Sequence, residues 1–401
     1  MKILLVNKFL YPNGGSETYI FSIGKCMEEM GHSVQYFGMQ DERNVVGNQV
    51  NSYTSNMDFH ASGMTRLLYP FKIIYSHEAR KAIRKVIENS QPDVVHLNNF
   101  NFQLTPSIIY EIKKKNIPIV YTAHDYQLVC PNHLMRNGKT NQNCNQCQGA
   151  SYKECTKNRC IHGSFVKSVL GSIEAWIYDK MRTYQRIDGI ICPSLFIKGK
   201  LLQNRNLTGK MIAIPNFIYG EMDEQIFEKR LVEHDFVFFF GRYSEEKGIK
   251  TLLEAARHLS GIQFVFAGKG PLDDLVCGDN IKNVGFVDTT MIKELIREAE
   301  FSIYPSEWYE NCPFSVMESI SEGTPVLGAR IGGIPELIEE GVTGKLFESG
   351  NIDDLIQKIE QIWENRDELK RNCKNNRGRD RFDTLEIYCK KLLKFYEECR
   401  G

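Results

Sequence analysis

Short apolar runs alternate with amphipathic stretches along almost the whole chain. The strand-like runs of the first half are KILLVN (2–7), SVQYFGM (33–39), PDVVHLNN (92–99), IPIVYTAH (117–124) and DGIICPS (188–194). Those of the second half are FVFFFGR (236–242), IQFVFAG (262–268), IKNVGFV (281–287), FSIYPS (301–306) and TPVLGAR (324–330). Strands that are apolar throughout and separated by helical patterns are typical of parallel sheets covered on both faces. The pattern therefore predicts an α/β protein with two doubly wound, Rossmann-like domains.

The boundary between the two sets of strands is expected within or just before residues 210–224, where a proline and a polar stretch separate them. We expect an N-terminal domain over residues 1–206 and a C-terminal domain over residues 207–382. The last segment, 383–401, contains a helix whose apolar stripe must pack on another surface, and we expect it to return to the first domain. Ligands of doubly wound sheets bind at the carboxyl ends of the strands. Two such domains facing each other across a cleft would place one ligand on each side.

The composition is that of an ordinary folded protein, with 42% hydrophobic and 25% charged residues. The apolar start is short and is interrupted by Asn7 and Lys8, so we expect a first strand there rather than a signal peptide, and a cytoplasmic protein. The formal net charge is zero, yet residues 1–220 carry about 26 Lys and Arg against about 15 Asp and Glu. This asymmetry indicates an anionic ligand or surface for the first half. The basic stretches 77–89 and 111–116 fit either a membrane-facing surface or ordinary solvated helix faces.

The carboxyl ends of the second-domain strands carry a distinctive set of residues. They are Arg242 and Lys247 after the first strand, Gly268 and Gly270 after the second, and the segment ENCPFSVME (310–318) after the fourth. Pro313 fits the first turn of a helix, because the amides of that turn have no partner inside the helix. A helix start presents those amides and a partial positive charge to an anion. With an arginine and a lysine beside it, the predicted ligand is a diphosphate.

Two acids, Glu310 and Glu318, stand on either side of this helix start. The helix from Pro313 to Glu318 rises about 7 to 8 Å, which matches the offset between a phosphate and a ribose. Carboxylates accept hydrogen bonds from neighbouring hydroxyls, so a sugar and a ribose are suitable partners. A single glutamate at either position would be interpreted as an ordinary surface or helix-terminal residue.

With these motifs the chain resembles the retaining glycosyltransferases of family 4, which have the GT-B fold and an E-x7-E segment, here Glu310 and Glu318. The resemblance extends over nearly the whole chain. It includes GGSET (14–18), TAHD (122–125), GRYSEEKG (241–248), GKGP (268–271) and GGIPEL (332–337). Each motif is a weak signal alone, whereas the complete set in this order is specific.

The resemblance implies a role for each matched residue. Arg242 and Lys247 would hold the donor diphosphate and stabilise it as it leaves. Glu310 would bind the hydroxyls of the donor sugar, and Glu318 would bind the ribose. The backbone of Asn311, Cys312, Pro313, Phe314 and Ser315 would surround the sugar and phosphate, while Gly268 and Gly270 would let the chain approach the base. No catalytic metal is implied.

The first domain contributes a second group of candidates. Gly14 and Gly15 lie between the first strand and a helix, where glycine permits close approach of backbone to ligand. The sequence there is not G-x-G-x-x-G, so a nicotinamide site has little support, and a simple turn is the alternative. The resemblance implies that this loop lies against the donor and that His124 positions the transferred sugar. His96 and Asn98, near the end of another strand, are weaker candidates.

Five of the twelve cysteines lie between residues 130 and 162, in an insert with little apolar content: Cys130, Cys144, Cys147, Cys155 and Cys160. The C-x2-C pair fits a metal knuckle, and a cytosolic protein rarely holds disulfides. A structural zinc would supply order here. Resemblance to related inserts suggests Cys130, Cys144, Cys147 and Cys160 as ligands, with Cys155 spare and His133 or His162 as substitutes. Free thiols, an iron–sulfur cluster or disulfides are the alternatives.

The expected activity is the transfer of a hexosyl group from a UDP- or GDP-linked sugar to a hydroxyl of a glycan or lipid-linked acceptor, with retention, in cell-surface polysaccharide synthesis. We expect no nucleic acid partner, and peripheral contact with an anionic membrane surface follows from the basic first half. One alternative keeps the fold but catalyses sugar-nucleotide epimerisation or phosphorolysis. Another is a nucleotide-sugar-binding or zinc-dependent scaffold without turnover.

Overall fold

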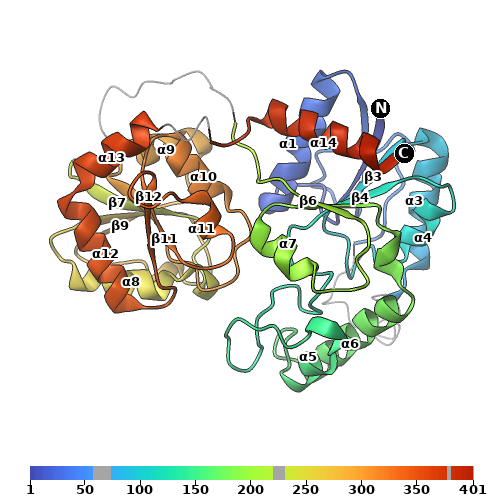
Figure 1. Ribbon diagram of the computed structural model, residues 1–401, viewed down its shortest axis with the longest axis horizontal. Helices are drawn as coiled ribbons and strands as arrows, with labels where there is room; N and C mark the ends of the chain where they lie inside the picture. Colours follow the sequence, from blue (N-terminus) through green and yellow to red (C-terminus); the bar gives the residue numbers. More distant parts are fainter. Residues whose placement is uncertain (57–73, 220–230, 377–380, 401) are drawn as a thin grey trace. The chain divides into compact units, whose positions relative to one another are not determined.

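The computed structural model describes residues 1–56, 74–219, 231–376 and 381–400. The chain divides into two compact units, of which unit 1 comprises Met1–Ile214 with Leu385–Gly401 and unit 2 comprises Pro215–Thr384. Each unit contains one six-stranded sheet with helices around it (Figure 1). The predicted α/β architecture with two Rossmann-like domains is confirmed.

The sheet of unit 1 has the strand order β2-β1-β3-β4-β5-β6, and all neighbouring strands are parallel. Its strands are β1 (Lys2–Val6), β2 (Ser33–Phe37), β3 (Val94–Leu97), β4 (Ile119–Thr122), β5 (Gly189–Cys192) and β6 (Lys210–Ala213). The described helices are α1 (Gly15–Glu29), α3 (His77–Ser90), α4 (Ile108–Lys113), α5 (Lys153–Lys157), α6 (Phe165–Lys180), α7 (Leu195–Leu201) and α14 (Leu385–Arg400), with 3-10 turns η1 (Gln148–Ala150) and η2 (Thr183–Arg186). Strands β3, β4 and β5 are buried along their whole length, as strands covered on both faces must be.

The sheet of unit 2 has the order β12-β11-β10-β7-β8-β9 and is also parallel throughout. Its strands are β7 (Phe236–Phe240), β8 (Gln263–Ala267), β9 (Ile281–Gly285), β10 (Phe301–Tyr304), β11 (Val326–Ala329) and β12 (Gly344–Phe347). The described helices are α8 (Ile249–His258), α9 (Thr289–Glu298), α10 (Phe314–Ser321), α11 (Ile334–Leu337), α12 (Ile352–Glu364) and α13 (Arg366–Asn375), with 3-10 turns η3 (Glu245–Lys247) and η4 (Asp273–Leu275).

The central strand β7 contributes side chains to a hydrophobic core on each face of the unit 2 sheet. Successive side chains of a strand point to opposite faces. Phe236, Phe238 and Phe240 therefore join one core with residues of α9 and α10, while Val237 and Phe239 join another with residues of α8 and α12. An all-apolar run such as FVFFF is explained by this double burial.

The division between the units follows Ile214, within the expected boundary stretch 210–224. It lies beyond the domain limit set at 206/207, because β6 pairs with β5 and so belongs to the first sheet. Residues 220–224 of the expected boundary stretch lie outside the described residues. The last helix, α14, belongs to unit 1. Its Tyr388, Leu392 and Tyr396 are completely buried there.

A buried polar network ties α14 to the unit 1 sheet. His96 on β3 is hydrogen-bonded through Nδ1 to the Tyr396 hydroxyl (2.6 Å) and through Nε2 to the Thr122 hydroxyl (2.7 Å). Tyr19 of α1 joins it through hydrogen bonds to Thr122 (3.1 Å) and Tyr388 (2.9 Å). Burial lowers the pKa of His96 to about 3, so its ring is neutral. His96 is thus a structural histidine of the core.

The two basic stretches of the first half are largely paired with each other and with nearby acids. Arg80 and Arg84 of α3 and Lys114 at the end of α4 all form ion pairs with the buried carboxylate of Glu111. Burial alone would raise the pKa of Glu111, but the hydrogen bonds from its cationic partners lower it to about 2. Lys113 pairs likewise with Asp188. Much of this positive charge therefore stabilises the packing of α3 on α4.

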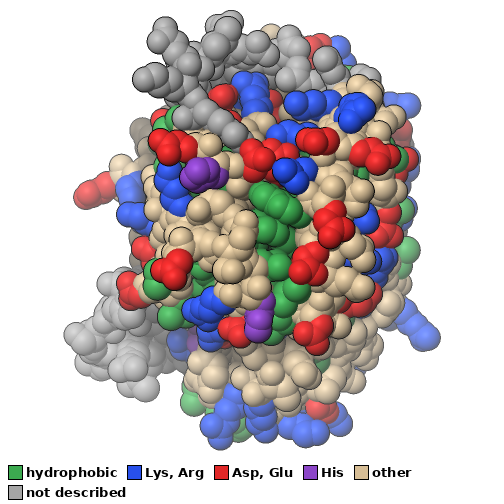
Figure 2. Space-filling view, turned by 90° about the vertical axis from the view of Figure 1, so that its left-hand side faces the viewer, with side chains coloured by type: hydrophobic (Ala, Val, Ile, Leu, Met, Phe, Trp, Pro, Cys, Tyr) green, Lys and Arg blue, Asp and Glu red, His purple; other side chains and the backbone are tan. Residues whose placement is uncertain are grey.

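The charged surface of unit 2 is mixed. Figure 2 shows a face of this unit on which acidic and basic side chains are interspersed around a narrow strip of hydrophobic side chains. The acidic excess of the second half is therefore not gathered into one patch on this face. Mixed surface charge of this kind suits solubility rather than steering of one ligand.

One carboxyl group of unit 1 is buried without an ionic partner. Glu174 of α6 is 3% exposed, and its Oε1 atom has no hydrogen-bond partner among the described residues. Burial raises its pKa from 4.5 to about 8. At neutral pH the protonated form therefore predominates in the folded protein.

We expect this carboxyl group to make unit 1 less stable as the pH rises. Its folded-state pKa lies above the unfolded value, so its contribution is fully present below pH 4.5 and is lost progressively up to about pH 8. Glu174→Gln should flatten this part of the pH dependence when the free energy of unfolding is measured in denaturant. The control variant Glu29→Gln removes an exposed carboxylate of α1 and should leave this pH dependence unchanged. Equal slopes in the wild type and Glu174→Gln would contradict this assignment.

Candidate active site

Lys247 and Glu310, predicted from separate motifs, are in direct contact in unit 2. The Lys247 Nζ atom lies 2.5 Å from Glu310 Oε1, which also accepts a hydrogen bond from the Ser306 hydroxyl (2.8 Å). The Glu310 carboxylate is largely buried, and burial alone would raise its pKa. The positive charge and hydrogen bond of Lys247 outweigh burial and hold the pKa below its usual value. Glu310 is therefore an ionised acceptor close to a cation.

Two neighbouring loops hold this pair in place. The Glu307 amide, after β10, donates to the carbonyl of Glu246 on the turn that carries Lys247 (2.9 Å). On the other side, the Gly333 amide donates to the carbonyl of Glu310 (2.8 Å). Gly332 has φ +59°, and a Cβ atom there would lie 2.1 Å from the Glu310 carbonyl oxygen. The glycine pair after β11 therefore lets that loop pack directly on the backbone of Glu310.

Helix α10 follows directly from this loop. It begins at Phe314, and Pro313 is its N-cap residue with extended backbone, so the expectation that Pro313 lies inside the first turn is wrong by one position. Its opening turn is fixed to β10, since the Tyr304 hydroxyl donates to the Ser315 carbonyl (2.9 Å). Glu318 lies on the same helix, and burial raises its pKa to about 7. Glu318 is therefore partly protonated near neutral pH, whereas Glu310 is ionised.

Arg242, Gly268 and Gly270 lie in the loops after β7 and β8. Arg242 is exposed. The glycines are explained by the fold itself, because a Cβ at Gly268 would lie 1.9 Å from the Gly241 carbonyl oxygen and one at Gly270 would lie 2.2 Å from that of Tyr243. The two loops are also joined by the Tyr243 amide, which donates to the Lys269 carbonyl (3.1 Å). The glycines therefore bring backbone against backbone.

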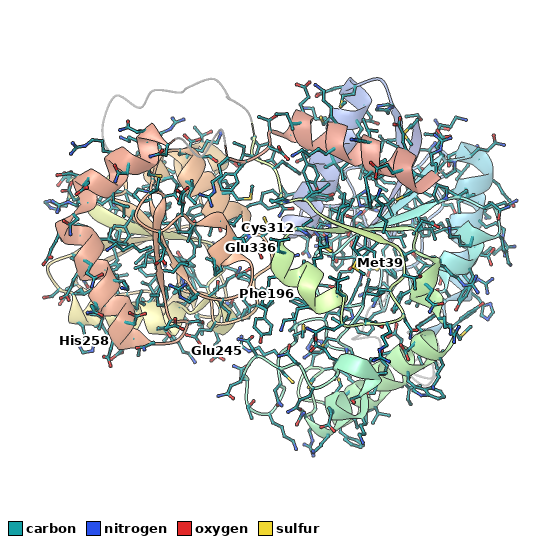
Figure 3. All side chains as sticks on the ribbon, viewed as in Figure 1. Met39, Phe196, Glu245, His258, Cys312 and Glu336 are labelled. Atoms are coloured by element: carbon teal, nitrogen blue, oxygen red, sulfur yellow. The ribbon has the colours of Figure 1, made fainter. Side chains whose placement is uncertain are left out.

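Cys312 is buried between α10 and the start of unit 2. The Asn216 side-chain amide donates to the Cys312 carbonyl (2.8 Å), and burial together with the nearby Glu336 raises the pKa of the Cys312 thiol to about 12. Cys312 and Glu336 are labelled next to each other in Figure 3. Asn311 precedes it in the same loop. Cys312 thus stabilises the loop before α10 through its backbone carbonyl and its buried side chain.

Sequence reasoning missed two residues that position the Lys247–Glu310 pair and its loop, Ser306 and Asn216. Gly332 was named as part of the GGIPEL motif, and a double glycine shortly after a strand is consistent with the close backbone approach seen here. The serine and the asparagine carried no such signal, since both are common loop residues. Their partners become apparent only in three dimensions.

The first-domain candidates gather at the carboxyl ends of β1, β3 and β4 in unit 1. Gly14 is the N-cap of α1 and Gly15 its first residue. The buried carboxylate of Glu17 accepts hydrogen bonds from Asn7 after β1 (2.8 Å) and from Ser16 (2.9 Å). The Asn99 amide after β3 donates to the side chain of Asn7 (3.0 Å). Glu17 therefore fixes the loop of Gly14 and Gly15 to the end of β1.

His124 follows β4 and lies beside this loop. Its Nε2 atom is 2.8 Å from Asn98 Oδ1, so Nε2 carries the proton and donates. Its ring also packs edge-on against Tyr19 with a centroid distance of 4.8 Å. Burial lowers the pKa of His124 to about 3. A neutral imidazole held in one orientation suits hydrogen bonding better than acid catalysis.

All five cysteines of the insert line one small cavity in unit 1, together with Val129 and Met135. The structure does not set Cys155 apart, because it lines the same cavity and is more buried than Cys144. His133 instead stacks on Phe102, and His162 is exposed. Within the described parts of the chain, no group of three or more His, Cys, Asp or Glu residues is arranged as a metal site.

Two family models match this chain. The model described as Glycosyltransferase Family 4 matches residues 13–219, and the one described as Glycosyl transferases group 1 matches residues 221–379. A 42.6 kDa protein from the cps region of Klebsiella pneumoniae is 23% identical over 84% of this chain and 87% of its own length.

Solved structures of the same fold cover almost the whole chain. Sucrose-phosphate synthase from Thermosynechococcus elongatus has a TM-score of 0.73 at 16% identity, over 99% of this chain and 98% of its own. HepE from Anabaena has a TM-score of 0.69 at 17% identity, over 99% of this chain and 100% of its own. These likenesses establish the GT-B fold. Because one family model alone spans more than half of the chain, the protein belongs to the glycosyltransferases of family 4.

Proposed function

We propose that this glycosyltransferase transfers a hexosyl group from a nucleoside diphosphate sugar to a hydroxyl of a glycan or lipid-linked glycan, with retention of configuration, in the synthesis of cell-surface polysaccharide. The observation that carries the proposal is the contact between Lys247 and Glu310 at the start of α10. HepE, which shares the fold, was solved with UDP and with UDP-glucose. This supports a nucleotide-sugar donor.

In the proposed donor complex, this contact would put a cation and an ionised acceptor where the donor sugar meets its diphosphate. Lys247 would bind the diphosphate, aided by the exposed Arg242 and by the free amides at the start of α10. Glu310 accepts hydrogen bonds only, so sugar hydroxyls are the partners that its chemistry selects. Glu318, four positions beyond Phe314, would accept the ribose hydroxyls.

The barrier would fall mainly through stabilisation of charge on the departing diphosphate. In the transfer step, the bond from the anomeric carbon to the diphosphate oxygen breaks and a bond to the acceptor oxygen forms on the same face. The acceptor proton passes to the leaving diphosphate. Lys247 and Arg242 stabilise the negative charge, and Glu310 fixes the orientation of the sugar. No residue of this set is assigned as a covalent nucleophile.

In unit 1, His124 and the loop of Gly14 and Gly15 would contact the donor. The neutral His124 ring, oriented by Asn98 and Tyr19, is suited to positioning the transferred sugar. The kinship with a protein of a cps region supports a role in surface polysaccharide synthesis.

Ligand-dependent thermal stability tests the donor. A donor that binds only the folded protein raises its unfolding midpoint, and the stabilisation grows with the logarithm of the donor concentration divided by its Kd. Full-length protein should be stabilised by either UDP- or GDP-linked sugars, and by the matching nucleoside diphosphate. Incubation with the stabilising sugar should then give slow donor hydrolysis, and an epimerised sugar nucleotide in place of transfer would indicate the epimerase alternative. Stabilisation without any turnover would leave only a binding scaffold.

Lys247→Ala and Glu310→Gln should each lower turnover by about tenfold or more, because each removes one half of the charge pair at the reacting centre. Initial rates with the stabilising donor measure the effect. Lys250→Ala is the matched control, since Lys250 lies on the adjacent turn and pairs with Glu245 in an exposed position. Circular dichroism and the unfolding midpoint show whether the variants fold. Wild-type rates in folded Lys247→Ala would exclude the assigned role.

We also propose that the insert binds a structural zinc ion through thiolates of the common cavity. Cysteine thiolates are preferred zinc ligands, and five thiols lining one cavity match that chemistry. Cys130, Cys144, Cys147 and Cys160 are the proposed set, and Cys155 is the nearest substitute. Bound zinc would hold the insert together.

Elemental analysis of protein purified without added metal should find about one equivalent of zinc per chain. Cys147→Ser should remove most of it, because Cys147 is a buried member of the set. Cys277→Ser, which changes an exposed cysteine of unit 2, should leave the metal content unchanged. Less than half an equivalent of any transition metal in the wild type would reject the site.

A further inference from the structure

Helix α6 exposes large hydrophobic side chains. Phe165 is 55% exposed, Val166 65%, Ile173 41% and Trp176 53%, and Met181 just beyond the helix is 50% exposed. These side chains recur at the helical spacing of one face. Single exposed hydrophobic residues are common on soluble proteins, whereas a set gathered on one helix indicates an interaction surface.

The polarity of α6 is inverted, because its small and polar residues are the buried ones. Ser168, Gly171, Ser172 and Glu174 all face the protein. Ser172 donates a hydrogen bond to the Tyr152 carbonyl (2.8 Å), and the Ile161 amide donates to the Ser168 hydroxyl (3.0 Å). The cysteine-rich insert therefore holds α6 by hydrogen bonds. Four of its large apolar residues, Phe165, Val166, Ile173 and Trp176, are left facing solvent.

Positive charge surrounds the exposed face. Lys167, Lys180 and Arg182 are exposed on α6 or directly after it, and Lys153, Lys157 and Arg159 are exposed on the adjoining α5 segment. Glu154 pairs with Lys157, so these two charges cancel, and Asp179 keeps its charge while accepting a hydrogen bond from the neutral Asn206. The other five basic residues named above outnumber this one acid. Burial raises the pKa of Glu174 to about 8, so it adds little negative charge at neutral pH.

An apolar helix face with a tryptophan, a phenylalanine and a basic rim matches a lipid–water interface. The 16 residues of α6 are too few to cross a bilayer. Across the described residues, no helix is both long enough and apolar enough to do so. A helix of this length is about 24 Å long and can lie flat in the headgroup region.

We propose that α6 is a docking surface for an anionic lipid bilayer, with its apolar face in the headgroup region and its lysines and arginine on the lipid phosphates. This inference does not rest on the donor or the reaction. It also moves the expected membrane contact away from α3 and α4, where much of the basic charge is committed to Glu111 and Asp188.

Flotation of the full-length protein with vesicles tests the proposal. Vesicles made of equal parts phosphatidylglycerol and phosphatidylcholine should bind the wild type at low salt, and pure phosphatidylcholine vesicles should bind it more weakly. Trp176→Glu combined with Ile173→Glu should weaken binding by about tenfold or more, because it places charge in the apolar face. Phe286→Glu is the matched control, since Phe286 is a 78% exposed aromatic residue of unit 2.

A second variant separates lipid contact from a folding effect. Trp176→Phe keeps the aromatic surface and should bind like the wild type. Quenching of tryptophan fluorescence by bromine-labelled lipid should, however, fall sharply in this variant, since it removes the residue placed at the lipid. Failure of the wild type to bind anionic vesicles would overturn the proposal. So would equal binding by the double variant, or loss of a dimer by that variant with no change in lipid binding, which would assign the face to a second copy of the chain.

Discussion

The ion pair between Lys247 and Glu310 is the interaction on which the candidate site depends. A buried carboxylate is costly unless a cation and hydrogen bonds compensate it. Here an ammonium group and the Ser306 hydroxyl provide that compensation. The arrangement requires the loops after β7, β10 and β11 to meet, which the parallel sheet achieves by ending these strands at one edge. The fold and the chemistry are therefore linked through backbone contacts between loops.

The two units use buried polar groups in different ways. In unit 2 the buried Glu310 carboxylate is charged, since it forms an ion pair with Lys247 in the loops after β7 and β10. In unit 1 burial keeps His96 and His124 neutral, and His96 joins strands and helices within the core. Its neighbour His124 has the same low pKa but lies at the end of β4, where its orientation is fixed by Asn98. The position of a histidine within a strand or beyond its end thus distinguishes the structural His96 from His124, the candidate sugar-binding residue.

The sequence predicts the sheets well because buried parallel strands leave an unmistakable apolar pattern, as in FVFFF and GIIC. It also places Lys247, Glu310 and His124 at the correct strand ends, because each follows its strand within a few residues. It does less well where partners lie far apart in sequence. The pairing of Arg80 with Glu111, and the hydrogen bond from Ser306 to Glu310, have no sequence signature. The pairing of β6 with β5 also has no sequence signature, and it is the reason why unit 1 extends past the domain limit expected at residue 206.

The return of α14 to unit 1 has a consequence for synthesis. Tyr388 and Tyr396 complete a core that contains residues from the very start of the chain, such as Tyr19. Unit 2 is a continuous segment and can fold as soon as its residues leave the ribosome. Unit 1 must wait for the final helix, so the part translated first acquires its native core last. During that interval the N-terminal sheet needs protection from aggregation, and loss of the last few turns would affect this unit before the other.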